Sequence, residues 1–428
     1  MSILFTNASI LGGKPTDIRT EGATIAEIGT GLPAGDSLVI DASGLIALPG
    51  LVDLHTHLRQ PGREDAETVL SGTKAAAAGG FTCVHAMANT TPTQDTAGVV
   101  EQVAKLGKKA GYAYVQPVGA VTVGLKGERL AELEAMFESR ANVTMFSDDG
   151  QCVSDPVLMR RALEYVRSFG GVIAQHAQEP RLTEGAQMHE GDVSAEIGLA
   201  GWPAVAEESI IARDCLLTQH VGSRLHVLHV STKGSVELIR WAKAQGINVT
   251  AEATPHHISL DHSKARSYDP RFKVNPPLRT ETDIAALKEA IADGTIDTIG
   301  TDHAPHPVEG KDCEWAAGAF GMTGLETALP VIHHELVISG ILDWAGVARV
   351  MSTKPAEIGG IADQGRPIAV GEPANMCFYD PDAPFTVRGA EQNTKSTNTP
   401  WEGVTLPGRV MHTVFRGHLT CREGKVTE

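Results

Sequence analysis

Short apolar runs alternate with stretches of helical periodicity between about Ala47 and Pro307. The runs have the length and composition of buried strands, and the stretches between them repeat apolar residues at the spacing of one helix face. The predicted strands are residues 48–54, 81–88, 113–121, 143–146, 172–175, 225–230, 249–253 and 298–301. The clearest predicted helices are residues 67–78, 155–169, 206–219, 235–244 and 281–292. This alternation predicts an α/β fold with a parallel sheet.

Polar residues follow nearly every predicted strand, as they do at the rim of a closed barrel. We therefore expect residues 48–364 to form a (β/α)8 TIM barrel, with a doubly wound open sheet as the alternative. The two ends of the chain contain short β segments broken by Gly-rich and Pro-rich turns, and neither end has enough apolar residues to fold alone. Residues 1–47 and 365–428 are thus predicted to pair in one small β domain beside the barrel.

Composition narrows the class of partner. The 428 residues carry 36 Lys and Arg against 52 Asp and Glu, a formal net charge of −16, which argues against a nucleic acid or an anionic membrane surface. The six cysteines lie far apart without a Cys-x-x-Cys pair, so neither a disulfide framework nor a thiolate zinc site is indicated. With no signal-peptide pattern and no long apolar run, we expect a cytoplasmic protein that binds a small molecule.

The strand ends carry residue types that bind metals. His55 and His57 follow an apolar run, and residues i and i+2 of a strand point to the same face, so both imidazoles can reach one ion at about 2.0 to 2.1 Å. Further candidates are the carboxylates at the end of the fourth strand and of the eighth strand, and the histidines that follow the fifth and sixth strands. These residues are Asp148, Asp149, His176, His229 and Asp302.

Each of these residues alone has an ordinary alternative. Asp148 and Asp149 could cap a helix or a turn, and a lone histidine at a strand end is more often a hydrogen-bonded core residue. Two such histidines on neighbouring strands, His176 and His229, argue against coincidence. Four imidazoles and two carboxylates, one from each of the two strand ends, are too many for one tetrahedral ion and suit two ions with a shared bridge.

Six stretches together resemble the dihydroorotases of the larger, multifunctional-type class, within the cyclic amidohydrolase superfamily. They span most of the predicted barrel, and their combination is far more specific than any one of them. The stretches are Asp53-Leu54-His55-Thr56-His57-Leu58-Arg59, Met87-Ala88-Asn89-Thr90, Phe146-Ser147-Asp148-Asp149-Gly150, Thr254-Pro255-His256-His257, Lys273-Val274-Asn275-Pro276-Pro277-Leu278-Arg279 and Thr301-Asp302-His303-Ala304-Pro305-His306.

The resemblance implies two Zn²⁺ ions per chain, with a carboxylate and a hydroxide between them. One ion would be held by His55, His57 and Asp302, and the other by His176 and His229. Many superfamily members use a carboxylated lysine as the bridge, but this chain has no lysine between Lys126 and Lys233. An aspartate must then bridge. Asp149 fits best by its spacing to His176, and Asp148 is the alternative. Mixed nitrogen and oxygen ligands would also accept manganese or cobalt.

The resemblance further implies the reversible cyclisation of N-carbamoyl-L-aspartate to dihydroorotate in pyrimidine (UMP) synthesis. The hydroxide would attack the ring carbonyl, and Asp302 would act as the general acid and base. Arg59 is the expected partner of the substrate carboxylate, because a guanidinium pairs with a carboxylate in a two-bond fork. The other substrate contacts that the resemblance implies are His57, Asn89, Asn275, His306 and the backbone at Phe320 and Gly321.

Several alternatives stay open. An allantoinase or a hydantoinase is the near rival, and a non-catalytic scaffold, for example for aspartate carbamoyltransferase, is the rival of a different class. A homodimer is a reasonable expectation for such enzymes. A solvent-exposed or structural role is expected for Arg63, and hydrogen bonding rather than ligation for His256, His257 and His303. The segment 310–313 is expected to lie in a loop that covers the substrate.

Overall fold

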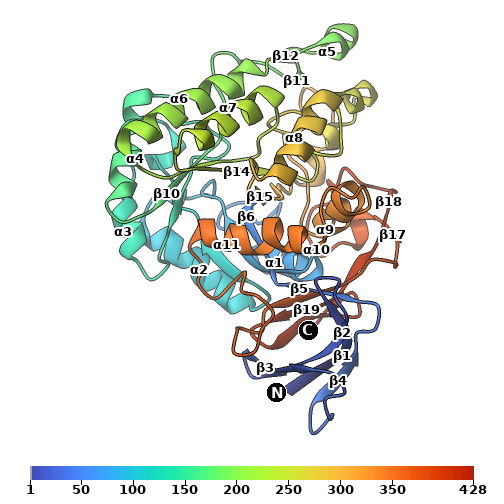
Figure 1. Ribbon diagram of the computed structural model, residues 1–428. Helices are drawn as coiled ribbons and strands as arrows, with labels where there is room; N and C mark the ends of the chain where they lie inside the picture. Colours follow the sequence, from blue (N-terminus) through green and yellow to red (C-terminus); the bar gives the residue numbers. More distant parts are fainter. Residues whose placement is uncertain (1) are drawn as a thin grey trace.

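The computed structural model describes residues 2–428, and it has an upper part of strands and helices and a lower sheet that contains both ends of the chain (Figure 1). The lower sheet is nine-stranded, with the order β21-β20-β19-β16-β5-β1-β2-β3 and with β4 paired to β1. Its strands are β1 (Ser2–Ile10), β2 (Pro15–Glu21), β3 (Thr24–Gly29), β4 (Leu38–Asp41), β5 (Ile46–Pro49), β16 (Met376–Asp380), β19 (Arg409–Phe415), β20 (His418–Arg422) and β21 (Lys425–Val426).

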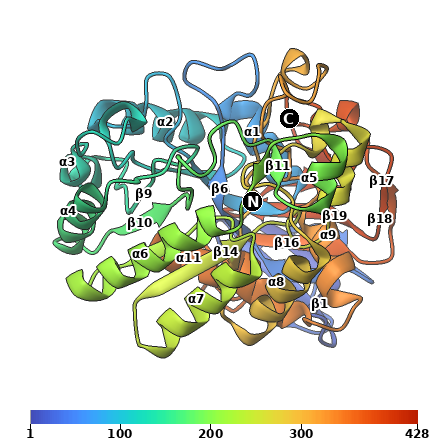
Figure 2. The same ribbon diagram turned by 90° about the horizontal axis from the view of Figure 1, so that it is seen from above.

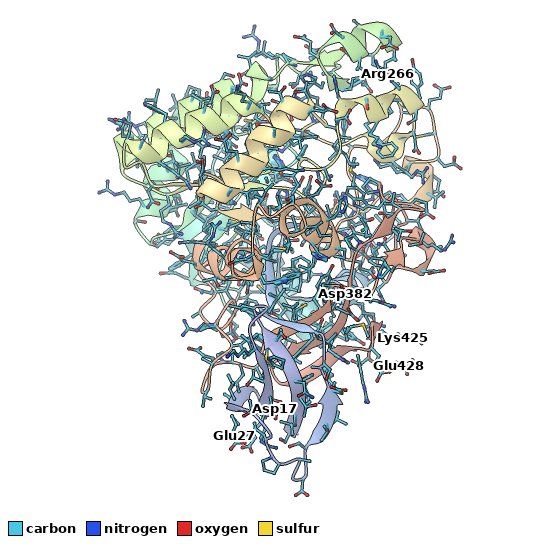
Figure 3. The ribbon with its side chains drawn as sticks, turned by 45° about the vertical axis from the view of Figure 1, so that its right-hand side comes forward. Asp17, Glu27, Arg266, Asp382, Lys425 and Glu428 are labelled. Atoms are coloured by element: carbon cyan, nitrogen blue, oxygen red, sulfur yellow. The ribbon has the colours of Figure 1, made fainter. Side chains whose placement is uncertain are left out.

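Strands from the two ends of the chain meet in the middle of this sheet. β16 pairs antiparallel with both β5 and β19, so it lies between an early strand and a late one. Phe5 of β1 stacks on Phe378 of β16 with ring centroids 4.1 Å apart, inside one cluster of buried apolar residues. The sheet lies at one end of the molecule, where Figure 3 marks Asp17 and Glu27, and Arg266 lies at the opposite end.

The upper part contains a three-stranded and a five-stranded parallel sheet, in the orders β6-β7-β8 and β15-β14-β13-β10-β9. Isolated parallel bridges join these sheets at both edges, from Gly119 to Phe146 and from Thr56 to His303. The strands are β6 (Leu51–Thr56), β7 (Phe81–Ala86), β8 (Tyr114–Pro117), β9 (Met145–Phe146), β10 (Val172–Gln175), β13 (Leu225–Val227), β14 (Val249–Ala253) and β15 (Thr298–Ile299).

Helices lie around these strands when the molecule is seen from above (Figure 2). They are α1 (Val69–Ala78), α2 (Ala97–Ala110), α3 (Leu133–Glu138), α4 (Pro156–Arg167), α6 (Val205–Val221), α7 (Lys233–Ala244) and α8 (Glu281–Asp293). Side chains at the start of several helices accept backbone N–H bonds, as Thr68, Asp155 and Thr232 do, which satisfies donors that have no partner within the helix. The five helices predicted from the sequence are confirmed, with ends that differ by about two residues.

The remaining elements connect or flank these layers. They are α5 (Asp192–Ile197) with β11 (Met188–His189) and β12 (Gly201–Trp202), α9 (Ala328–Ile332), α10 (Trp344–Ala348), α11 (Lys354–Gly359), and the pair β17 (Phe385–Thr386) and β18 (Thr405–Leu406). Among residues 2–428, none of the helices combines the length and the apolar character needed to cross a bilayer.

One predicted strand is wrong. The apolar run 48–54 is divided at Gly50 into β5, which pairs with β16, and β6, which pairs with β7. A Cβ at Gly50 would lie 2.2 Å from the Thr82 hydroxyl oxygen, and the Gly50 N–H donates to the Asn375 carbonyl. The chain therefore passes from one sheet to the other at a position where a side chain does not fit, and hydrophobicity alone carries no sign of this.

Candidate active site

The predicted metal ligands converge at the carboxyl ends of the parallel strands. His55 lies in β6, and Asp149, His176 and His229 follow β9, β10 and β13. Asp149 belongs to two groups whose candidate ligand atoms all lie within 4.8 Å of one another, one with His55 and His57 and the other with His176 and His229. All five side chains are buried.

The two oxygens of Asp149 face different histidines. Oδ2 lies 3.3 Å from Nε2 of His55 and 3.3 Å from Nε2 of His57. Oδ1 lies 3.1 Å from Nδ1 of His176 and 3.3 Å from Nε2 of His229. The carboxylate thus stands between two pairs of imidazoles, with one oxygen for each pair.

Asp302 completes the first group. Its Oδ1 lies 3.1 Å from Nε2 of His57 and 3.5 Å from Nε2 of His55. The backbone is unusual here, since Asp302 has φ +47° and His229 has φ +31°. Residues with a Cβ rarely adopt such values, which cluster at functional sites.

The second ring nitrogen of three histidines is anchored by an oxygen. His55 Nδ1 donates to Glu252 Oε1 at 2.6 Å, and His57 Nδ1 donates to Asn89 Oδ1 at 3.0 Å. His176 Nε2 donates to Gln178 Oε1 at 2.7 Å. These hydrogen bonds orient each ring so that its other nitrogen faces Asp149, where it can serve as the ligand atom when a metal replaces the proton.

Electrostatics favour ionised carboxylates in the centre. Burial by itself would lower the pKa of His55, but Asp149, Glu252 and Asp302 raise that pKa well above its usual value. Burial by itself would raise the pKa of Asp149, but the neighbouring histidines, His55 foremost, hold that pKa well below its usual range. The pKa of Asp302 is lowered for the same reason, chiefly through His55 and His57. The negative charge of these buried carboxylates therefore has to be neutralised either by protons on the histidines or by bound cations.

The residues of the centre fit divalent cations. His55 Nε2 is buried and has no hydrogen-bond partner among residues 2–428, although it faces two carboxylates. His176 Nδ1 and His229 Nε2 lie 2.8 Å apart, so two ring nitrogens converge on one point beside Asp149. A set of imidazole nitrogens and carboxylate oxygens is typical of zinc and related ions.

Asp148 has a different environment from Asp149. Its Oδ1 accepts the backbone N–H groups of Val121 and Thr122 at 2.8 and 2.9 Å, and Oδ2 accepts the Thr122 hydroxyl. These bonds tie the end of β9 to the chain after β8. Of the two aspartates that the sequence left open as the bridge, the geometry favours Asp149.

Arg59 lies beside this centre with φ +60°. Its Nε donates to the Pro305 carbonyl at 3.1 Å, and a terminal nitrogen lies 3.4 Å from His306 Nε2. Among residues 2–428 the guanidinium forms no ion pair with a carboxylate. Burial lowers its pKa to about 10, although Asp302 opposes this shift. A guanidinium without an anionic partner is free to receive a carboxylate from a ligand.

Four of the other predicted substrate residues form a wall that reaches Arg59 through His306. They are His306, Phe320, Gly321 and Asn275. His306 Nε2 donates to the Phe320 carbonyl at 2.8 Å, and the Gly321 N–H donates to the Lys273 carbonyl at 2.9 Å. Both backbone groups are thus already bonded within the protein. Asn275 Nδ2 donates to Gln178 Oε1 at 3.0 Å, while Asn275 Oδ1 is buried without a partner.

Glu252 and Gln178 are parts of the site that were not predicted from the sequence. Glu252 Oε1 also accepts the backbone N–H of His229, and its other oxygen lies 3.4 Å from His226 Nε2. A Cβ at Gly300 would lie 2.6 Å from Glu252, so glycine makes room for this carboxylate. The only available signal was an acidic residue inside the apolar run 249–253.

The remaining histidines of the predicted site make local hydrogen bonds. His303 Nε2 lies 3.3 Å from Glu67, and His303 Nδ1 accepts the Gly324 N–H. His257 bonds to the Thr254 hydroxyl and the Pro276 carbonyl. His256 Nε2 is buried without a hydrogen bond, and burial lowers the pKa of this imidazole to about 4. None of the three belongs to the two candidate ligand groups.

The structure is similar to solved hydantoinases, which belong to the class of cyclic amide hydrolases. The structure matches the solved L-hydantoinase (dihydropyrimidinase) from Arthrobacter aurescens with a TM-score of 0.89 and 26% identity, over 100% of this chain and 97% of that chain. It also matches the D-hydantoinase (dihydropyrimidinase) from Thermus sp. with a TM-score of 0.81 and 25% identity, over 99% and 96% of the two chains.

Sequence comparison is more specific. Residues 44–235 match the family model described as dihydro-orotase-like. The dihydroorotase of Streptomyces coelicolor is 63% identical over 99% of this chain and 99% of its own length, and that of Mycobacterium tuberculosis is 52% identical over 100% of both chains. The chain belongs to the dihydroorotase family, and it is an enzyme of the cyclic amide hydrolase class.

Proposed function

We propose that this enzyme is a dihydroorotase with two zinc ions, which interconverts N-carbamoyl-L-aspartate and (S)-dihydroorotate in pyrimidine synthesis. The observation that carries the proposal is Asp149, whose two oxygens each face one pair of imidazoles. His55, His57 and Asp302 would hold one ion, His176 and His229 the other, with Asp149 between them. When bound, the ions supply Lewis acidity and an activated water.

Asp302 is proposed as the general acid and base. Its lowered pKa means that it is ionised at neutral pH and can accept a proton from the attacking water. The proton would then pass to the ring nitrogen as the amide bond breaks. In the direction of ring closure, Asp302 would take that proton from the carbamoyl nitrogen.

Arg59 is proposed to bind the substrate carboxylate. Two features support this role: the guanidinium has no carboxylate partner within residues 2–428, and it lies next to the centre at Pro305 and His306. Asn89, His57 and His306 would line the same end of the substrate, and Asn275 with the backbone at Phe320 and Gly321 would line the ring amide. Asn275 Oδ1 is the one buried oxygen of this set that lacks a donor.

Several wider proposals accompany this function. The bridges at both edges of the parallel sheets support a closed (β/α)8 barrel at residues 48–364, with residues 1–47 and 365–428 as the small β domain. The aspartate bridge and the absence of a lysine between Lys126 and Lys233 support the larger class of dihydroorotases. We also propose a cytoplasmic enzyme, with a second copy of the chain or aspartate carbamoyltransferase as candidate partners.

The test is a ring-opening assay on dihydroorotate, allantoin and dihydrouracil, with metal analysis of the same preparation. We expect turnover of dihydroorotate alone and about two zinc ions per chain. The Arg59→Met variant should raise the KM for dihydroorotate by about 100-fold, because a charged bidentate hydrogen bond is lost.

The structural similarity to hydantoinases makes dihydropyrimidinase activity the second candidate. Turnover of dihydrouracil without turnover of dihydroorotate would establish that candidate and refute the proposal. An Arg59→Met variant with an unchanged KM would leave the substrate carboxylate without its proposed partner.

A further inference from the structure

Two buried lysines tie together the segments that carry the substrate-pocket wall. Lys311, which is 7% exposed, donates from Nζ to the carbonyls of Pro270 and Lys273 at 2.8 and 3.0 Å. Lys273, which is 2% exposed, donates from Nζ to the carbonyls of Trp315 and Ala316 at 2.8 and 3.1 Å. Each lysine therefore donates hydrogen bonds to backbone carbonyls of the segment that contains the other lysine.

Neither ammonium group has a carboxylate partner among residues 2–428. Burial lowers the pKa of Lys311 to about 7, and the charge of Lys273 adds to this effect while Asp269 opposes it. A buried, unpaired charge costs stability, and an apolar side chain of similar size would avoid that cost. The two buried lysines are thus better explained by the backbone segments that they hold in place than by a contribution to stability.

The lysines connect directly to the proposed substrate contacts. The carbonyl of Lys273 that accepts from Lys311 also accepts the Gly321 N–H. The Lys273 ammonium lies 4.5 Å from the centroid of the Phe320 ring, and the Phe320 carbonyl accepts from His306. Asn275 follows Lys273 by two residues, so both sides of the ring-binding region depend on this pair.

A polar cavity of about 410 Å³ lies against the same wall and is lined by residues that include Lys311, His306 and Asn398. Asn398 accepts a hydrogen bond from the His306 N–H and donates to the carbonyls of Ala304 and Gly321. It therefore links His306 to Gly321 independently of the lysines. Without the Lys311 bonds, the segment 307–319 would have open space beside it into which it could move.

We propose that Lys311 is a positioning residue for substrate binding. It holds the chain after β15 against the segment that contains Lys273. In this way it fixes how far Asn275 lies from the group formed by His306, Phe320 and Gly321. This inference rests on the proposed function. Lys311 does not contact the candidate metal ligands, so its effect should fall on substrate affinity and not on metal binding.

The test compares Lys311→Met and Lys311→Arg with Lys354→Met as a control, because the Lys354 side chain is 40% exposed and forms an ion pair only with Glu357. Lys311→Met should raise the KM for dihydroorotate by about tenfold, the effect expected when charged hydrogen bonds that order a binding wall are lost, with kcat changed by less than about twofold. Lys311→Arg keeps charged donors and should recover most of the loss. Metal content should be unchanged in all three variants.

Hydrogen exchange provides a readout that is independent of the substrate. Amides of residues 314–321 should exchange faster in Lys311→Met than in the parent enzyme, with no change around Asp149. If Lys311→Met is poorly folded, Lys273→Met provides the same comparison from the opposite segment.

An unchanged KM in a folded Lys311→Met enzyme, or equal exchange in residues 314–321, would overturn the inference. A loss of metal together with a fall in kcat would also overturn it, because it would indicate a general structural role. By contrast, a parent enzyme that does not act on dihydroorotate would refute the proposed function, while the exchange experiment would still decide whether Lys311 orders this wall.

Discussion

At the scale of single residues, the site depends on pairs of neighbours that have different tasks. Asp148 and Asp149 are adjacent, yet one accepts backbone N–H groups of the preceding strand end and the other lies among four imidazoles. The two positions therefore form a matched pair for experiment.

Asp149→Asn should lose bound metal and nearly all activity, because an amide offers one acceptor oxygen where the carboxylate offers two. Asp148→Asn should keep the metal and cost about 1 to 3 kcal/mol of stability at most, since its bonds are to backbone and hydroxyl groups. Metal analysis and thermal unfolding of both variants check this. Equal metal loss in the two would refute the assignment of Asp149 as the bridge.

Glu252→Gln tests the anchoring of His55. A neutral amide holds the Nδ1 proton less strongly than the carboxylate does, so metal affinity should fall by about 10-fold to 100-fold. Activity should return when metal is added in excess. Glu237→Gln on the exposed face of α7 is the control, and a similar effect there would contradict the prediction.

At the scale of elements, the alternation of strands and helices could be predicted from the sequence, but the points where the chain passes from one sheet to another could not. Residues 172–175 and 249–253 coincide with β10 and β14, because buried parallel strands are nearly continuous apolar runs. The division at Gly50 depends on Thr82 and Asn375, and the role of Glu252 depends on His55, which is 197 residues away. Such contacts exist only in the folded chain, so local patterns cannot report them.

The segment that carries Gly321 allows a prediction at this scale. Gly321 has φ +139°, and a Cβ there would lie 2.7 Å from the Ala304 Cβ and 2.8 Å from His306 Nε2. Gly321→Ala should therefore displace His306 and destabilise the protein by about 1 to 3 kcal/mol, with a raised KM.

Gly371→Ala is the matched control, because Gly371 also has a positive φ, +89°, but a Cβ there meets nothing within 4 Å. Unfolding and steady-state kinetics of the two variants separate backbone strain from crowding. An unchanged KM in Gly321→Ala would show that His306 does not need this close approach.

At the scale of the whole molecule, residues 393–395 are held against the rest of the chain by the carboxylates of Glu67 and Glu326. Glu326 accepts the backbone N–H groups of Asn393 and Thr394 at 2.7 and 3.2 Å. Glu67 accepts the Lys395 N–H at 3.1 Å and lies 3.3 Å from His303 Nε2. Stability should consequently respond to the protonation of these carboxylates.

Burial raises the pKa of Glu326 from 4.5 to about 7, despite the bonds from Asn393. The folded protein then holds this proton more tightly than the unfolded chain, so the free energy of unfolding should decrease as pH rises from about 4.5 to about 7, by about 3 kcal/mol for this group. Glu326→Gln should remove that part of the decrease and be the more stable form at pH 8. Denaturant unfolding at several pH values checks this, and parallel profiles would contradict it.

The position of β16 between β5 and β19 has a consequence for biosynthesis. While the ribosome is still translating the parallel sheets, β1 to β5 have emerged but lack the strands from residues 376–426 that complete their sheet, so Ile3, Phe5 and Ile18 cannot yet be fully buried. The nascent chain therefore exposes an unpaired β edge and part of its apolar cluster through most of its synthesis.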